Sequence, residues 1–251
     1  MLLWIILFTI LGSVFSMVGG VFLLWRENFT RKISLFLISF AAGVLLGVGF
    51  LDLIPEAFEG LGDLSKVTFS ALAAISVLFV IERFLWWYHH HRFEAEEHSK
   101  EHVGHKVNKA HAYLLLTGDS IHNFVDGVVI AAAFLADFSL GVGVAVGVIA
   151  HEVPQEIADF GVMISSGFDK MKTLLLNFAT ALSSLLGAII AYFALQQVEA
   201  VIPYILAVAA GVFIYISLSD LIPAIHHRSE HKYDILHFLL FTGGIALIFL
   251  M

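Results

Sequence analysis

The sequence predicts an all-α polytopic membrane protein with about eight transmembrane helices. Of its 251 residues, 59% are hydrophobic and 14% are charged, whereas a soluble domain carries roughly 25% charged residues. The mean hydropathy is +0.92, and the charges are clustered so that long apolar runs lie between them. Cysteine is absent, which excludes disulfides, cysteine zinc sites and cysteine nucleophiles. The sequence has no basic patch that would indicate a nucleic-acid partner.

Eight apolar runs are each long enough to cross a bilayer, which takes about 20 residues. They cover residues 2–25, 33–54, 67–88, 110–136, 140–165, 171–195, 201–225 and 235–251. The cations Arg26, Arg31 and Lys32 follow the first run, whereas a cleavable secretory signal has its cations in front. We therefore expect a retained first span with its N-terminus outside.

The positions of Lys and Arg give this topology an orientation, because cytoplasmic loops are enriched in both residues. With the N-terminus outside, the loops after spans 1, 3, 5 and 7 face the cytoplasm and hold nearly all the cations. Arg83 can reach the same side from the end of span 3. Of the 13 Lys and Arg residues, Lys66 alone falls on the outer side. The pattern predicts that both termini lie outside.

A short repeat links spans 2 and 7, which end in Asp52-Leu53-Ile54-Pro55 and Asp220-Leu221-Ile222-Pro223. The two spans cross the membrane in opposite directions, as matching helices do in transporters built from inverted repeats. The sequence thus indicates a single transporter domain over residues 1–251 with a 3+2+3 organisation. Spans 1–3 and 6–8 are the repeats, and spans 4 and 5 lie between them. A chance match in Leu- and Ile-rich sequence is the alternative.

The predicted cytoplasmic loop at residues 89–109 is rich in histidine and glutamate. Its histidines are His89, His90, His91, His98, His102 and His105. Such a tract either binds metal or is a solvated linker in which the histidines are incidental. His226, His227 and His231 fall in the loop after span 7, on the same predicted side, which favours metal binding slightly.

Spans 4 and 5 hold many ionisable residues, although each costs about 2.5–3.5 kcal/mol near the bilayer centre. On span 4, Asp119, His122 and Asp126 are spaced i, i+3 and i+7 along one helix face, with Asn123 beside them. Span 5 carries two neighbouring stripes of polar residues. One consists of His151, Gln155 and Asp159, and the other of Glu152 and Glu156. Packed together, the two helices would present imidazole nitrogens and carboxylate oxygens to one cleft. This donor set suits Zn²⁺, Fe²⁺ or Mn²⁺.

Several other residues are weaker candidates for an ion pathway. Asp52 and Glu56 lie toward the outer end of span 2, Asp220 near the inner end of span 7, and His111 at the inner mouth of span 4. They either line the pathway or face water at the interface. Pro154 frees a backbone carbonyl inside span 5, and we expect Gly118 and Gly127 to permit close helix approach in span 4.

The segments His122-Asn123-Phe124-Val125-Asp126-Gly127 and His151-Glu152-Val153-Pro154-Gln155-Glu156 resemble the paired signatures of the ZIP (Zrt/Irt-like) metal transporters. The similar branch has HNFxDG on its fourth helix and HEVPHE on its fifth. The eight spans, the outside termini and the His-rich loop also resemble this family, so the resemblance covers essentially the whole chain.

The resemblance implies metal import into the cytoplasm by rocking of one helix group against another. It implies a primary site of His122, Asp126, His151 and Gln155, and an adjacent site of Asn123 and Glu152 that shares Asp126. Gln155 stands where the similar branch has a second histidine. An amide oxygen is a neutral and weaker ligand, so we expect a softer preference for zinc.

The sequence therefore predicts a transporter, with no enzymatic activity, in the cell (inner) membrane of a prokaryote. Its substrates are Zn²⁺ first and then Fe²⁺, Mn²⁺ or Cd²⁺, its surroundings are lipid, and no organic cofactor is expected. A homodimer is one arrangement left open. One alternative is a proton-coupled carrier of another solute. The other is an intramembrane metal-dependent hydrolase, since His151-Glu152-Val153-Pro154-Gln155 nearly matches the HExxH motif.

Overall fold

The computed structural model describes residues 1–25, 27–97, 109–229 and 231–251, and its regular elements there are all helical. In chain order they are α1 (Leu2–Trp25), α2 (Glu27–Gly47), the π-helix η1 (Val48–Leu53), α3 (Ile54–Leu61), α4 (Leu64–Glu97), α5 (Lys109–Ala136), α6 (Phe138–Ser165), α7 (Lys170–Leu195), the 3₁₀-helix η2 (Glu199–Val201), α8 (Ile202–Ile216), the π-helix η3 (Ser217–Leu221), α9 (Ile222–Arg228), the 3₁₀-helix η4 (His231–Tyr233) and α10 (Asp234–Phe249). The predicted all-α class is confirmed.

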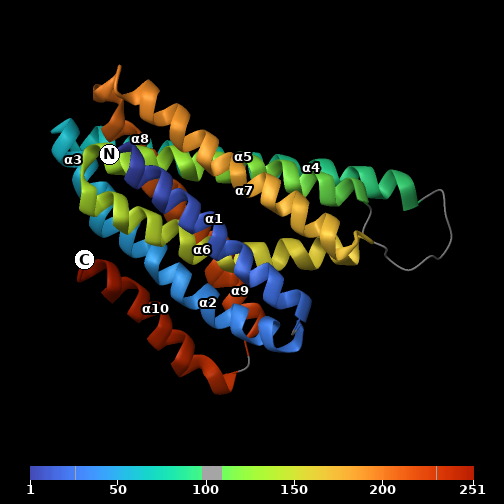
Figure 1. Cartoon of the computed structure of the whole chain (residues 1–251). Helices are drawn as coiled ribbons and strands as arrows, with labels where there is room; N and C mark the ends of the chain where they lie inside the picture. The colour runs from blue at the N-terminus through green and yellow to red at the C-terminus, as the bar shows by residue number, and fades with distance from the viewer. Residues whose placement is uncertain (26, 98–108, 230) are drawn as a thin grey trace.

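Within the described residues, 8 helical stretches are long and apolar enough to span a membrane. They are Leu2–Phe22, Ile33–Leu61, Leu64–Phe84, Ala112–Ala136, Phe138–Ser165, Lys170–Leu195, Glu199–His227 and His231–Phe249. Each corresponds to one predicted span. Both chain ends lie at one end of the bundle, while α2 and α7 begin at the other (Figure 1).

The predicted loop at residues 89–109 is partly wrong, because α4 continues to Glu97. His89, His90 and His91 are therefore on a helix that extends past the apolar span. Apolar composition ends where the membrane ends, but Glu, Ala and Arg are good helix formers in water as well. His98, His102 and His105 lie outside the described residues.

The second and seventh spans each contain a π-helical segment just before their Ile-Pro pair. η1 ends at Leu53 before α3, and η3 ends at Leu221 before α9. Each proline closely follows the π-helical turn within one continuous helix, so its missing N–H leaves a carbonyl oxygen of that turn without a helical hydrogen bond. The two segments thus share a local structure as well as the sequence Asp-Leu-Ile-Pro.

The similarity of the second and seventh spans extends further than these four residues. Both also contain Ala-Ala-Gly-Val at the same distance before the shared aspartate, starting at Ala41 and at Ala209. Ser217 Oγ donates to the Ala42 carbonyl oxygen at 3.0 Å, and a Cβ built at Gly49 would lie 3.5 Å from the Ala210 carbonyl oxygen. In the alignment of the two spans, Gly49 corresponds to Ser217 and Ala42 to Ala210, so the contact is reciprocal.

The other helices pack in pairs that correspond in the same way between the two repeats. α10 packs on α2 as α4 packs on α8, and α6 packs on α1 as α5 packs on α7. Likewise, η1 lies against α8 and η3 lies against α2. This is the contact pattern that an inverted repeat produces.

α5 and α7 approach each other closely, and this contact fixes where the polar residues of α5 lie along the bundle. A Cβ at Gly127 would lie 1.8 Å from the Ser184 carbonyl oxygen, and one at Gly187 would lie 2.1 Å from the Phe124 carbonyl oxygen. The expectation for Gly127 is therefore confirmed. The expectation for Gly118 is wrong, because nothing lies within 4 Å of a Cβ built there.

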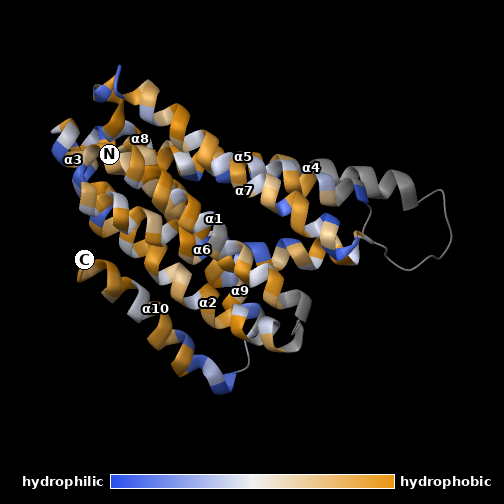
Figure 2. Ribbon diagram, viewed as in Figure 1, coloured by the Kyte–Doolittle hydropathy of each residue, from blue (hydrophilic) through white to orange (hydrophobic). Residues whose placement is uncertain are grey.

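The outer surface of the bundle is largely apolar. Leu3, Phe69, Leu72 and Ile235 are among its exposed large side chains, and hydrophobic residues run along most of the helices in Figure 2. Exposing so large an apolar surface to water would cost free energy, so this surface suits contact with the hydrocarbon of a bilayer. Hydrophilic residues gather at many of the helix ends (Figure 2).

Candidate metal centre

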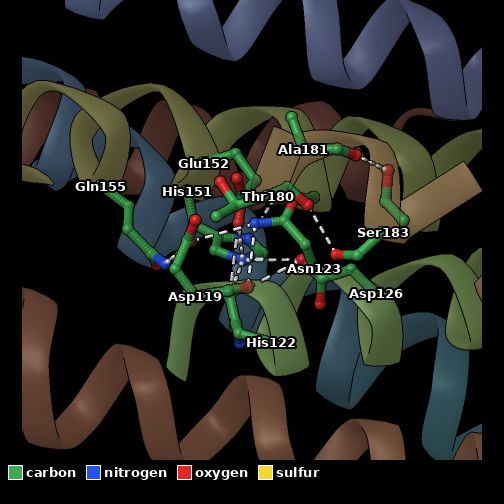
Figure 3. A network of polar contacts seen from close by, with 12 residues as sticks. Asp119, His122, Asn123, Asp126, His151, Glu152, Gln155, Thr180, Ala181 and Ser183 are labelled. Atoms are coloured by element: carbon green, nitrogen blue, oxygen red, sulfur yellow. Dashed lines mark hydrogen bonds and ion pairs between the residues drawn. The ribbon is translucent and has the colours of Figure 1, made fainter. Parts of the chain in front are cut away.

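His122 and Asp126 on α5 face His151 and Glu152 on α6 across the interface between the two helices (Figure 3). One ligand atom from each of the four residues lies within 4.8 Å of the other three. Asp126, His151 and Glu152 are buried, with exposed fractions of 1%, 2% and 3%, while His122 is half-buried. Among the described residues, this is the group of His, Asp and Glu side chains that converges in this way.

The spacing of the four atoms suits a tetrahedral ion. His122 Nε2 lies 3.1 Å from His151 Nε2 and 3.4 Å from Glu152 Oε1. His151 Nε2 lies 3.3 Å from Asp126 Oδ2, and the two remaining N–O separations are 3.7 and 3.8 Å. Nitrogen and oxygen ligands at about 2.0–2.2 Å from Zn²⁺ form a tetrahedron with edges of about 3.3–3.6 Å. The distance between the imidazoles falls just below this range and two N–O distances lie above it, so the side chains would adjust to hold the ion.

A backbone contact fixes the tautomer of His151. Its Nδ1 lies 3.0 Å from the Gly147 carbonyl oxygen, which can only accept, so Nδ1 carries the hydrogen. The lone pair of Nε2 is then directed toward the cluster. Metal-ligating histidines commonly have this arrangement, because a hydrogen bond at the second nitrogen fixes the ring orientation.

Two carboxylate oxygens of the cluster have no hydrogen-bond partner. They are Asp126 Oδ2 and Glu152 Oε1, and each lies within 4 Å of both imidazole Nε2 atoms. Buried acceptors without partners are costly unless a cation or donor satisfies them. The donor set of two imidazoles and two carboxylates meets the needs of Zn²⁺ and similar first-row ions.

The amide side chains beside the cluster are held by Asp119. Asn123 Nδ2 and Gln155 Nε2 both donate to Asp119 Oδ1, at 3.0 and 3.2 Å (Figure 3). Glu152 offers a ligand atom beside those of His122, Asp126 and His151. With both amide nitrogens directed to Asp119, the amide oxygens are the atoms left for an ion.

The hydrolase alternative fits this geometry poorly. In the HExxH arrangement two histidines hold the metal and the glutamate acts as general base. Here the position of the second histidine is Gln155, which donates to Asp119, while Glu152 lies among the candidate ligands.

The weaker sequence candidates are spread over both ends of the bundle. Asp52 and Glu56 line a hollow of about 230 Å³ together with Glu59 and Asp137, near the end where the chain termini lie. Asp220 is exposed in η3 and accepts from Ser219 at 3.0 Å. For His111 the helix backbone is described but the side chain is not, which is also true of His89, His90 and His91.

Glu156 and Asp159 continue the polar face of α6 beyond the cluster, and both are buried. Three buried polar residues of α7, namely Thr173, Asn177 and Thr180, were not among the predicted residues. Their spacing of i, i+4 and i+7 is the sequence signal that could have identified them. Ser183 and Ser184, by contrast, bond to Ser120 and Ser13 between helices, as expected of packing residues.

An eight-span bundle with this cluster between two of its helices defines a polytopic α-helical membrane protein with a candidate cation site among its spans. A sequence profile described as ZIP zinc transporter matches residues 1–112 and 94–251. The chain belongs to this family.

Relatives of the chain include several zinc transporters of animals. Zinc transporter zipt-7.2 of Caenorhabditis elegans is 36% identical over 147 residues, which cover 57% of this chain and 32% of that protein. Zinc transporter ZIP4 of Mus musculus is 37% identical over 133 residues, 53% of this chain and 20% of that protein. Zinc transporter ZIP13 of Pongo abelii is 28% identical over 228 residues, 85% of this chain and 65% of that protein. The chain thus spans 32% or less of the first two relatives, and these animal proteins give no support to a prokaryotic membrane.

Proposed function

We propose that this protein carries divalent transition-metal ions across a membrane through the cluster of His122, Asp126, His151 and Glu152. The observation that carries the proposal is the convergence of two imidazole nitrogens and two carboxylate oxygens within 4.8 Å. The cluster lies in helices long enough to cross a bilayer. A purely structural membrane protein has no need of such a group, since each ionisable side chain costs about 2.5–3.5 kcal/mol near the bilayer centre.

Zinc is the substrate that the donor set and the relatives favour first. The relatives are described as zinc transporters, and mixed nitrogen and oxygen ligands also accept Fe²⁺, Mn²⁺ and Cd²⁺. The neutral amide of Gln155 beside the cluster adds no charge, which supports a broader metal range. The ion is cargo, so the function requires no organic cofactor.

Transport is directed into the cytoplasm in this proposal, with both chain termini outside. The excess of Lys and Arg at the opposite end of the bundle supports that orientation. The hollow lined by Asp52, Glu56 and Asp137 is then the outer approach to the cluster. Asp220 and His111 belong to the cytoplasmic end.

The test is uptake of Zn²⁺, Fe²⁺, Mn²⁺ and Cd²⁺ into proteoliposomes. We compare the wild type with His122→Ala, Asp126→Ala and His151→Ala. Each substitution removes one donor atom, so we expect uptake to fall by about tenfold or more. Glu199→Gln is the control, because this exposed residue of η2 is outside the cluster.

Two results would contradict the proposal. Uptake by the three cluster variants at the wild-type rate would mean that the ion takes another route. Wild-type vesicles that move protons but take up none of the four metals would instead indicate a proton-coupled carrier of another solute.

A further inference from the structure

A second group of buried polar atoms lies next to the metal centre, on the side toward the start of α5 and the end of α6. On α6, Glu152, Glu156 and Asp159 are spaced i, i+4 and i+7, so they follow one face away from the cluster. Glu156 has an exposed fraction of 1%, and neither of its carboxylate oxygens has a hydrogen-bond partner. A side chain of this kind, inside a membrane bundle, requires a ligand or a proton.

Asp119 lies on the neighbouring helix α5, where it accepts a hydrogen bond from Gln155 of α6. Its carboxylate and those of Glu156 and Asp159 lie within electrostatic range of one another and of Glu152. Asp119 Oδ1 accepts from Asn123 and Gln155, whereas Asp119 Oδ2 has no hydrogen-bond partner. Its unpaired oxygen is thus a third acceptor in the same region, in addition to the two of Glu156.

α7 closes this region with a row of polar side chains. Thr180 lies beside Asp119 (Figure 3), and Asn177 and Thr173 follow toward the start of α7. Asn177 Nδ2 donates to the Thr173 carbonyl oxygen and to Met163 Sδ of α6. Asn177 Oδ1 and Thr173 Oγ1 have no partner, and both residues have an exposed fraction of 0%.

The unpartnered buried side-chain atoms of the described residues are concentrated here. Two of them, Asp126 Oδ2 and Glu152 Oε1, belong to the histidine cluster, and one, Thr9 Oγ1, lies on α1. The others belong to Asp119, Glu156, Thr173 and Asn177. All are oxygens, and leaving such groups unpaired in an apolar interior costs roughly 1–3 kcal/mol each. Four helix positions therefore retain oxygen ligand atoms that packing alone would remove.

We propose that Asp119, Glu156 and Asp159, with Thr173, Asn177 and Thr180 of α7, form a second cation site built from oxygen atoms alone. It takes a divalent ion that has left the histidine cluster. Carboxylate, amide and hydroxyl oxygens without imidazole suit hard ions such as Mn²⁺ and bind Zn²⁺ more weakly. A weak second site favours onward movement, since an ion must leave each site that it enters. The inference rests on the proposed transport function for its biological sense.

The second site differs from the histidine cluster in how tightly its atoms converge. Within the described residues, ligand atoms of His, Asp and Glu converge within 4.8 Å of one another in the cluster around His151 and not in the second site. The oxygens of the second site are more widely spaced. An ion there keeps part of its hydration shell, and water molecules bridge to the more distant oxygens.

The experiment measures Mn²⁺ binding to the purified full chain by electron paramagnetic resonance. His122→Ala with His151→Ala removes both imidazoles, and we expect this double variant to keep one Mn²⁺ per chain. Adding Glu156→Gln and Asp159→Asn to it should weaken that binding by at least about tenfold, because two charged oxygen donors become neutral. The double variant binding no Mn²⁺, or the added substitutions leaving binding unchanged, would overturn the proposal.

A matched pair of threonine substitutions tests whether α7 contributes to the second site. Thr173→Val should weaken Mn²⁺ binding in the double variant, whereas Thr9→Val should not. Both hydroxyls are buried and unpartnered, but Thr9 lies toward the other end of the bundle, on the helix whose Trp4 contacts Phe138. Equal effects of the two substitutions would remove Thr173 from the site. These experiments measure binding and not transport. Failure of the wild type to transport metal would contradict the proposed function, while Mn²⁺ binding would still decide whether the second site exists.

Discussion

The Nε2 atoms of His122 and His151 lie 3.1 Å apart between α5 and α6. Since Nδ1 of His151 donates to the Gly147 carbonyl oxygen, Nε2 of His151 is an acceptor and the shared hydrogen belongs to His122. An ion bound by both nitrogens requires that hydrogen to move to Nδ1 of His122. The two rings thus already have the separation of neighbouring ligands, and the ion takes the place of one hydrogen.

Asp126→Asn should sharply weaken zinc binding. The substitution keeps the shape of the side chain but removes the charge of a carboxylate that lies 3.3 Å from His151 Nε2. Loss of groups that only support a ligand already costs about 10–100-fold in affinity, so we expect at least that loss in a calorimetric titration. Glu199→Gln, in the exposed turn before α8, is the control. An unchanged affinity for Asp126→Asn would exclude this carboxylate from the site.

Gln155→His should shift the protein toward zinc. The new imidazole would replace an amide that now donates to Asp119, and it would offer the cluster a third histidine nitrogen. Nitrogen donors favour Zn²⁺ over Mn²⁺, so competition between the two metals should change by about tenfold. Identical competition curves for variant and wild type would place Gln155 outside the coordination sphere.

Gly127→Ala should destabilise the protein, whereas Gly118→Ala should not. A Cβ at position 127 would lie 1.8 Å from the Ser184 carbonyl oxygen, whereas nothing lies within 4 Å at position 118. We expect the first change to cost about 1–3 kcal/mol through forced separation of α5 and α7. The second should be neutral or stabilise α5 by up to about 1 kcal/mol. Thermal unfolding in detergent measures both, and equal melting temperatures would contradict the close approach at Gly127.

The orientation can be tested because the chain has 0 cysteines. Single substitutions Lys66→Cys and Lys170→Cys place a thiol in exposed positions at opposite ends of the bundle. With the termini outside, a membrane-impermeant maleimide should label Cys at position 66 in intact cells and at position 170 only after permeabilisation. The reverse pattern would invert the proposed topology and the direction of import.

The spans and the cluster residues could be predicted because their signals are local. A bilayer demands a long apolar run, and His122, Asp126, His151 and Glu152 stand out because charged groups are rare in such runs. Helical spacing then determined which of them share a face.

The features that sequence did not reveal depend on partners in space. Gly118 and Gly127 look alike in sequence, and only Gly127 meets a neighbouring helix. The sequence also did not reveal that the amide nitrogen of Gln155, a predicted ligand, donates to Asp119 on another helix. Thr173 and Asn177 are ordinary residues for a membrane helix, and their importance depends on their lacking hydrogen-bond partners in the folded chain.

The π-helical turns of η1 and η3 hold one residue more than an α-helical turn would. If either turn returned to the α pattern, everything beyond it would rotate by about 100°, the angle of one residue. Asp52 and Asp220 lie inside these turns, so such a change would swing a carboxylate at one face of the membrane while the other stayed in place. The structure thus places one carboxylate in a widened helical turn toward each end of the bundle.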